Sequence, residues 1–243
     1  MSSSDRSAGI GRPPPLGALD LEAHLRDPRA RQAFVTPMFD TIAPRYDRFT
    51  RLFSFGMDAR WKRDVVAWAA APPWPGSRVL DLACGTGDLA FGVAAAREDV
   101  HVLALDASPR MVEQAQARRS RERAADRVRI GTGDMMALPF ADASFDIATV
   151  GYGFRNVPEW TRALDEVARV LRPGGRLVSL DFFRPEQALW RTLFLAWLSA
   201  AGNAVGWAWH REPVVYGYIS RSIDHFVSWE TFARALQQRG FQV

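Results

Sequence analysis

Two closely spaced glycines, Gly85 and Gly87, constrain the fold of this chain more than any other feature. They end an apolar run at Val79–Leu82 that is typical of a buried strand, and a helical pattern resumes from Leu89. Glycine lets the backbone approach a ligand that a side chain would exclude, and the helix N-terminus behind it offers unpaired N–H groups. The segment therefore predicts a strand, a turn and a helix arranged around a bound cofactor.

The acidic residue Asp81 indicates which cofactor this turn binds. Gly85, Gly87 and Ala90 also satisfy the dinucleotide pattern Gly-x-Gly-x-x-Gly/Ala, so an NAD-binding oxidoreductase is one alternative. A carboxylate four residues ahead of the first glycine would repel a negatively charged pyrophosphate. The same carboxylate would attract the sulfonium and α-amino groups of S-adenosylmethionine, which we therefore expect as the cofactor.

A second carboxylate, Asp106, follows the next apolar run, His101–Leu105, roughly 20 residues past the glycines. An acid at the end of such a strand commonly holds the ribose hydroxyls of a cofactor. Ser108 and Pro109 come next and are typical of a helix start, so Asp106 could instead cap that helix. The two roles are compatible.

The rest of the chain alternates between strand and helix patterns after a proline-rich linker at 72–76. This alternation predicts a doubly wound, mostly parallel α/β sheet of the Rossmann-like class, preceded by a helical, aromatic segment over 34–68. The expected strands are Val79–Leu82, Val102–Leu105, Val128–Ile130, Phe145–Val150 and Arg176–Leu180, and the expected helices are Asp88–Ala96, Arg110–Arg123 and Trp160–Val170.

We expect one domain over residues 34–243. Residues 1–33 are rich in Ser, Pro, Gly and Arg and have no apolar run of the kind found in signal peptides, so they are predicted to be a disordered tail. A sixth strand is predicted to begin at Phe241–Val243, so the last strands of such a sheet would be missing.

The composition argues against several other classes of protein. The net charge is +4, but the densest arginine run, 118–123, contains Glu122 and fits a solvated helix face better than a nucleic-acid surface. Cys84 is the only cysteine, which excludes a disulfide within the chain. The histidines have no metal-ligand spacing, so no metal is expected.

An apolar, aromatic segment, Trp190–Trp209, interrupts the alternation after the fifth strand. Arg191, Asn203 and two glycines make it a poor membrane span. Three interpretations stay open: a core helix, a helical cap over an apolar substrate, or a surface that dips into a membrane interface, where tryptophan is enriched. We expect the whole apolar insertion to cover about residues 186–222.

Five blocks between Phe34 and Val243 resemble the ubiquinone/menaquinone-biosynthesis C-methyltransferases, a family with the class I methyltransferase fold. The glycine turn and the Pro-Gly-Gly turn are shared by many methyltransferases, whereas the first and fourth blocks are more specific. The blocks are Tyr46-Asp47 with Ser54, Gly56 and Trp61; Gly85–Asp88; Gly133–Phe140 closed by Ser144–Asp146; Gly153–Val157; and Arg169–Gly175.

The resemblance implies methyl transfer from S-adenosylmethionine to a ring carbon of a polyprenylated benzoquinol or naphthoquinol in respiratory quinone biosynthesis. Thr86, Asp106 and the pair Asp134-Met135 match the cofactor positions of the family. Because such a substrate lives in the bilayer, we expect a cytoplasmic enzyme that contacts the inner face of the membrane peripherally.

The reaction needs a base or a cation that stabilises a phenolate on the ring. Arg155 is protonated at essentially any pH, so we assign it, with Asn156, to phenolate stabilisation and ring positioning. Tyr46 is expected to help close the site, although it could simply be an aromatic core residue. Asp58 and His210 are candidate proton acceptors.

The sequence departs from the family pattern at three places. Phe49-Thr50 stands where Met-Asn is frequent, Asp58 replaces a histidine, and Gly151 replaces a serine that contacts the cofactor. Phe49 and Asp58 are expected on the substrate side, so a methyltransferase of another apolar aromatic or polyketide molecule is an alternative. A non-catalytic binding module is a further alternative, which the intact cofactor residues disfavour.

Overall fold

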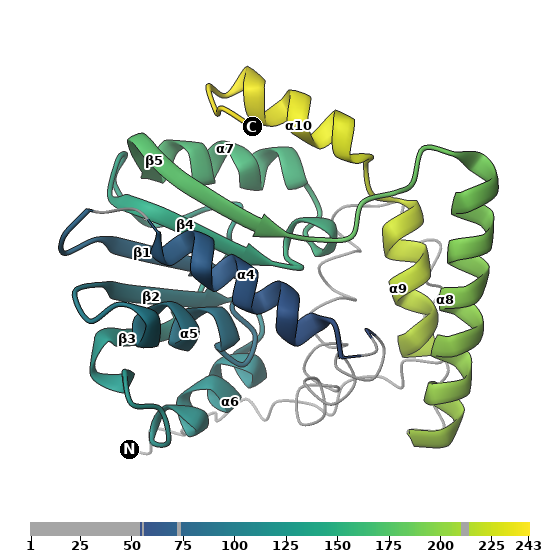
Figure 1. Ribbon diagram of the computed structural model, residues 1–243, viewed down its shortest axis with the longest axis horizontal. Helices are drawn as coiled ribbons and strands as arrows, with labels where there is room; N and C mark the ends of the chain where they lie inside the picture. Colours follow the sequence, from purple (N-terminus) through teal and green to yellow (C-terminus); the bar gives the residue numbers. More distant parts are fainter. Residues whose placement is uncertain (1–53, 55, 72–73, 210–213) are drawn as a thin grey trace, which may run out of the picture.

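Five strands form a single parallel sheet in the order β3-β2-β1-β4-β5 (Figure 1). This computed structural model describes residues 54, 56–71, 74–209 and 214–243. Within these ranges it describes the side chains of all residues except 201–209 and 214–217. The strands are β1 (Arg78–Leu82), β2 (His101–Asp106), β3 (Val128–Thr132), β4 (Phe145–Gly151) and β5 (Leu171–Leu180). Every neighbouring pair is parallel, so the predicted Rossmann-like α/β sheet is confirmed.

Helices cover both faces of this sheet. Successive side chains of a strand point to opposite faces, and Val79 and Leu80 accordingly belong to two separate cores, one against α4 and α5 and the other against α7 and α10. The helices are α4 (Asp58–Ala70), α5 (Asp88–Ala96), α6 (Pro109–Arg119), η3 (Ala125–Arg127), η4 (Phe154–Asn156), α7 (Trp160–Val170), α8 (Ala188–Trp209), α9 (Val214–Asp224) and α10 (Trp229–Gln238).

Two predicted boundaries and one predicted strand were wrong. Helix α6 ends at Arg119 instead of near Arg123, because the chain turns and forms η3 before β3. Strand β5 begins at Leu171, and the Pro-Gly-Gly turn is an irregularity inside its pairing with β4. No strand forms at Phe241–Val243; instead the backbone N–H of Phe241 bonds to Leu236 at the end of α10.

The predicted apolar insertion forms two long helices beside the sheet. Helices α8 and α9 pack against each other, and α9 returns alongside α8 toward α10 (Figure 1). Within the described ranges, no helix combines the length and hydropathy that a membrane span requires. The predicted tail over 1–33 and the aromatic residues up to 53 lie outside the described residues.

Candidate functional site

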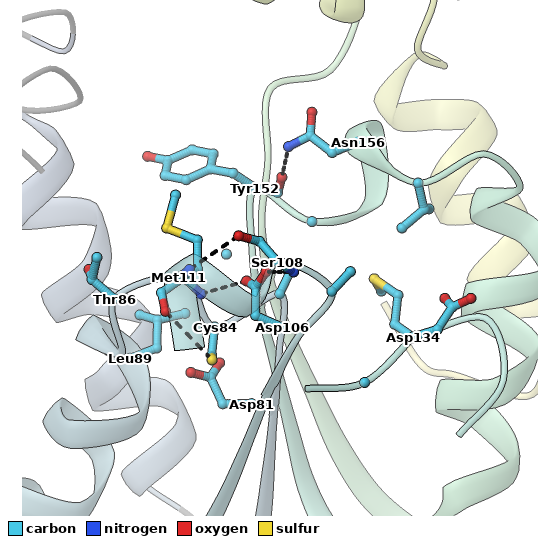
Figure 2. Close-up of a pocket in the computed structure, with 18 of the residues that line it drawn as sticks. Asp81, Cys84, Thr86, Leu89, Asp106, Ser108, Met111, Asp134, Tyr152 and Asn156 are labelled. Atoms are coloured by element: carbon cyan, nitrogen blue, oxygen red, sulfur yellow. Dashed lines mark hydrogen bonds between the residues drawn. The ribbon is translucent and has the colours of Figure 1, made fainter. Parts of the chain in front are cut away.

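A cavity that is partly open to solvent lies at the carboxyl ends of β1, β2 and β4 (Figure 2). Parallel strands bring these ends to one edge, where ligands bind in open α/β sheets. Six of the seven predicted cofactor residues line the cavity: Asp81, Gly85, Thr86, Asp106, Asp134 and Met135. Asn156 lines it as well, whereas Gly87 and Arg155 do not.

The glycine turn, residues 85–88, needs glycine for two different reasons. Gly85 and Gly87 both have positive φ angles, of 54° and 88°, which cost other residues backbone strain. A Cβ on Gly85 would meet nothing within 4 Å, so this glycine leaves the cavity side open. A Cβ on Gly87 would lie 2.7 Å from the Phe91 ring, so Gly87 shapes the turn from behind instead of lining the cavity.

Asp81 lies fully buried at the floor of the cavity. Its carboxylate accepts hydrogen bonds from Thr149 Oγ1 at 2.6 Å and from the backbone N–H of Ala90 at 3.1 Å. Burial raises the pKa of Asp81 to about 7, although both hydrogen bonds oppose the shift. Because a neighbouring cation favours the charged form of a carboxyl, this residue is suited to a positively charged ligand.

Asp106 connects two loops at the cavity (Figure 2). Its carboxylate accepts from the backbone N–H of Gly85 and from that of Ser108, each at 2.8 Å. Ser108 itself caps α6, because its Oγ accepts from the backbone N–H of Met111 at 3.1 Å. A carboxylate has about four lone-pair sites, so Asp106 can hold these loops and still accept ribose hydroxyls.

The loop after β3 forms another wall of the cavity. Asp134 Oδ1 accepts from the backbone N–H of Met136 at 2.8 Å, which fixes the loop. Met135 is buried and lines the cavity, where its thioether side chain can contact a flat aromatic base. Burial also raises the pKa of the Cys84 thiol, which favours its uncharged form.

These residues fit S-adenosylmethionine. The cavity presents the carboxylates of Asp81 and Asp106 to a cationic ligand that carries a ribose, beside an open glycine turn and a methionine wall. Gly151 also lines the cavity, and a Cβ there would lie 3.0 Å from the Leu89 side chain. A serine at this position would therefore require Leu89 to shift.

Asn156 is held in a single orientation at the cavity. Its Oδ1 accepts from Arg155 Nη1 at 3.1 Å and from the Tyr218 hydroxyl at 2.9 Å. Its Nδ2 donates to the backbone carbonyl of Tyr152 at 2.6 Å (Figure 2). An amide nitrogen carries two N–H groups, and among the described residues nothing accepts the second one.

Arg155 is placed behind Asn156, away from the cavity lining. It is buried, and its Nε lies 3.1 Å from Asp181 Oδ1 in an ion pair that is not a well-aligned hydrogen bond. Its guanidinium also lies over the rings of Tyr152 and Phe182, 5.7 and 5.9 Å from their centroids. Arg155 is thus positioned to orient Asn156, and its predicted role in phenolate stabilisation stays a prediction.

Sequence reasoning missed two further residues at this site. Tyr152 lines the cavity with a strained φ of 58° and donates from its hydroxyl to Asp58 at 2.9 Å. Lys62 also lines the cavity and pairs with Asp58 at 2.8 Å. In the sequence, the only signal for the pair of Lys62 and Asp58 was that Asp58 departs from the family pattern. That departure did not show that both residues belong to α4. Tyr46 and His210 lie outside the described residues.

We expect Asp106→Ala to weaken S-adenosylmethionine binding at least tenfold, because charge-assisted hydrogen bonds to the ribose are worth about 1.5–3 kcal/mol. Isothermal titration calorimetry measures this change. Asp126→Ala, which removes an exposed carboxylate from η3, is the matched control and should bind normally. An unchanged affinity in Asp106→Ala would rule out the ribose role.

Comparisons with known proteins point in one direction. The sequence model described as the ubiE/COQ5 methyltransferase family matches residues 27–243. The demethylmenaquinone methyltransferase of Lactiplantibacillus plantarum is 37% identical, over 86% of this chain and 87% of its own length. The ubiquinone/menaquinone biosynthesis C-methyltransferase UbiE of Brucella anthropi is 35% identical, over 89% of this chain and 82% of its own. Among solved structures, YcgJ of Bacillus subtilis shares the fold, with a TM-score of 0.57 at 24% identity over 74% of this chain and 68% of YcgJ.

Proposed function

The chain belongs to the ubiE/COQ5 methyltransferase family, and we propose that it methylates a ring carbon of a polyprenylated quinol in respiratory quinone biosynthesis. Its cofactor is S-adenosylmethionine. The observation that carries the proposal is one cavity that contains both the cofactor carboxylates and the oriented amide of Asn156. The names of the relatives supply the substrate class, and this chain covers most of the length of each relative.

When bound, S-adenosylmethionine supplies a methyl group on a sulfonium. The chain itself has to hold the quinol carbon in line with that methyl and to exclude water. We assign Asp81, Asp106 and Asp134 to cofactor binding, with Gly85, Thr86 and Met135 shaping the pocket and Gly87 supporting its turn. Tyr46 is assigned to closing the site.

The nucleophilic ring carbon becomes reactive when a neighbouring hydroxyl is deprotonated, so the protein should stabilise the resulting phenolate. We assign this role to the second N–H of Asn156 Nδ2. Arg155 and Tyr218 occupy Oδ1 of the amide, so the amide cannot rotate to present its oxygen to a negatively charged ring. Arg155 therefore acts as a positioning residue, and it adds a positive charge behind the amide.

A direct assay tests the proposed reaction. The protein is incubated with methyl-labelled S-adenosylmethionine and either demethylmenaquinol or a benzoquinol precursor, each with a short prenyl tail. We expect label in the extracted quinone, and no label in the quinone extracted from a reaction without enzyme. Transfer to a non-prenylated aromatic or polyketide acceptor, with none to either quinol, would replace this proposal by the alternative substrate class.

We also propose that α8 contacts a membrane surface. Four large apolar side chains on α8 are exposed, and we call them the α8 ridge: Leu189 (75%), Trp190 (59%), Leu193 (57%) and Trp197 (42%). Leu198, by contrast, is buried. This exposure disfavours the core-helix interpretation for the described start of α8. Arg184 and Arg191 flank the ridge and could meet anionic head groups.

Replacing Trp190 and Trp197 together by serine should weaken binding to anionic vesicles tenfold or more, since burial of a large apolar side chain contributes about 1.5–3 kcal/mol. The melting temperature should change little, because both side chains are exposed. Co-sedimentation and a thermal melt measure the two effects. Trp68→Ser, on an exposed tryptophan of α4, is the matched control. Loss of stability without vesicle binding by the parent protein would instead support a structural role.

A further inference from the structure

Lys62 has a place in the cavity that the proposed reaction does not explain. It is the only lysine in the chain, and it is the one cationic side chain among the described residues that line the cavity. We propose that Lys62 binds the α-carboxylate of the methionine part of S-adenosylmethionine. This inference rests on the cofactor and is independent of the quinol.

The contacts of Lys62 leave one donor for a ligand. Its Nζ lies 2.8 Å from Asp58 Oδ2 and 2.8 Å from Asp88 Oδ2. An ammonium group has three N–H donors, so these two carboxylates leave one N–H, which no other described residue accepts. The side chain is 16% exposed, which places a nearly enclosed charge at the cavity wall.

Lys62 stays charged in this environment. Burial alone would lower its pKa, but Asp88 and Asp58 outweigh that effect and raise the pKa above its ordinary value. Asp88 in turn pairs with Arg118 from α6, so α4, α5 and α6 meet at this point. The ammonium group is therefore held in position from both sides before a ligand arrives.

The α-carboxylate of S-adenosylmethionine needs a cation nearby, because the cavity lining is rich in carboxylates. S-adenosylmethionine carries a sulfonium, an α-ammonium and an α-carboxylate. The lining residues include four carboxylates, Asp81, Asp88, Asp106 and Asp134, which attract the two cationic groups but repel the anionic one. Lys62 lies next to Asp88 at the N-terminus of α5, where the helix dipole also favours an anion.

A lysine suits this position better than the arginine found at every other basic position of the chain. The ammonium is compact and directs its three donors in different directions, whereas a guanidinium is a planar fork. Lys62 can thus satisfy Asp58, Asp88 and a third carboxylate together. A guanidinium would pair best with one carboxylate in its own plane.

Removing the charge from Lys62 should affect one ligand selectively. Calorimetry would compare S-adenosylmethionine with its decarboxylated form, which keeps the sulfonium and the amine. In Lys62→Met we expect binding of S-adenosylmethionine to weaken roughly tenfold or more, as for loss of one charge-assisted hydrogen bond. Binding of the decarboxylated ligand should stay within about twofold of the parent.

Two further variants keep the test informative if the lost ion pair harms the fold. Arg118→Met breaks the other ion pair of Asp88 without touching the cavity lining, and both ligands should bind it normally. The double variant Lys62→Met/Asp58→Asn removes the buried carboxylate that the single change leaves without a cationic partner. It should retain the parent melting temperature. Its ligand binding should match that of Lys62→Met, with weaker binding of S-adenosylmethionine and near-parent binding of the decarboxylated form.

Equal weakening of both ligands, or no weakening of either, in a folded Lys62 variant would overturn the proposal. Neither measurement involves a quinol. Failure here would therefore leave the proposed methylation untouched, and failure of the quinol assay would leave the ligand selectivity of Lys62 untouched.

Discussion

Asn156→Ala should lower kcat about 100-fold while leaving the affinity for S-adenosylmethionine near its parent value, because loss of one preorganised oxyanion donor typically costs about 10²–10³-fold. The donor in question is the second N–H of Nδ2, at the cavity wall. Steady-state kinetics with a short-tailed quinol measure the change, and calorimetry measures cofactor binding. Normal turnover would remove Asn156 from the mechanism.

Two companion variants separate donation from packing. Asn156→Asp keeps the shape of the side chain but replaces the donor with a carboxylate, so it should be at least as slow as Asn156→Ala. Tyr218→Phe removes one of the two donors that orient the amide and leaves the donor from Arg155 in place. Its kcat should fall less, because one donor still orients the amide. If all three variants behaved alike, the orientation argument would be wrong.

Arg155→Ala should have the largest effect on stability. The Asp181 side chain is 1% exposed and would lose the cationic partner that Arg155 provides. Removing one member of a buried ion pair typically destabilises a protein by about 3–5 kcal/mol. We expect a loss of this size in the free energy of unfolding, measured with denaturant. Turnover should also fall, but by less than in Asn156→Ala, because Tyr218 still donates to the amide of Asn156.

The stability loss in Arg155→Ala should depend on pH. Burial raises the pKa of Asp181, and Arg155 opposes that rise, so removing Arg155 raises the pKa further. A carboxyl whose pKa is higher in the folded than in the unfolded protein binds more protons when folded, so stability falls as pH rises through this window. The window begins near the unfolded value of about 3.9.

Denaturation midpoints measured upward from pH 4 would test this dependence, at temperatures where the variant is folded. We expect the difference between parent and Arg155→Ala to shrink toward the acidic end. The double variant Arg155→Ala/Asp181→Asn, which removes the titrating group, should show a flatter profile. A difference that does not change with pH would mean that Asp181 is not the source of the instability.

The fold class, and most of the predicted cofactor residues that line the cavity, could be read from the sequence. Strand and helix patterns repeat over a few residues, so β1, the glycine turn and α5 could be predicted from local periodicity and glycine chemistry. Parallel strands then bring their carboxyl ends to one edge, which placed Asp81 and Asp106 together. These inferences require only short segments of chain and a general rule of sheet geometry.

The side-chain contacts around the cavity could not be predicted from the sequence. Tyr152 and Asp58 are separated by 94 residues, and Tyr218 and Asn156 by 62. Lys62 reaches Asp88 from a different helix, and Arg155 turns to Asp181 instead of the cavity. Such contacts depend on how helices pack on the sheet and on the cost of burying an unpaired charge, and neither leaves a periodic trace in the sequence.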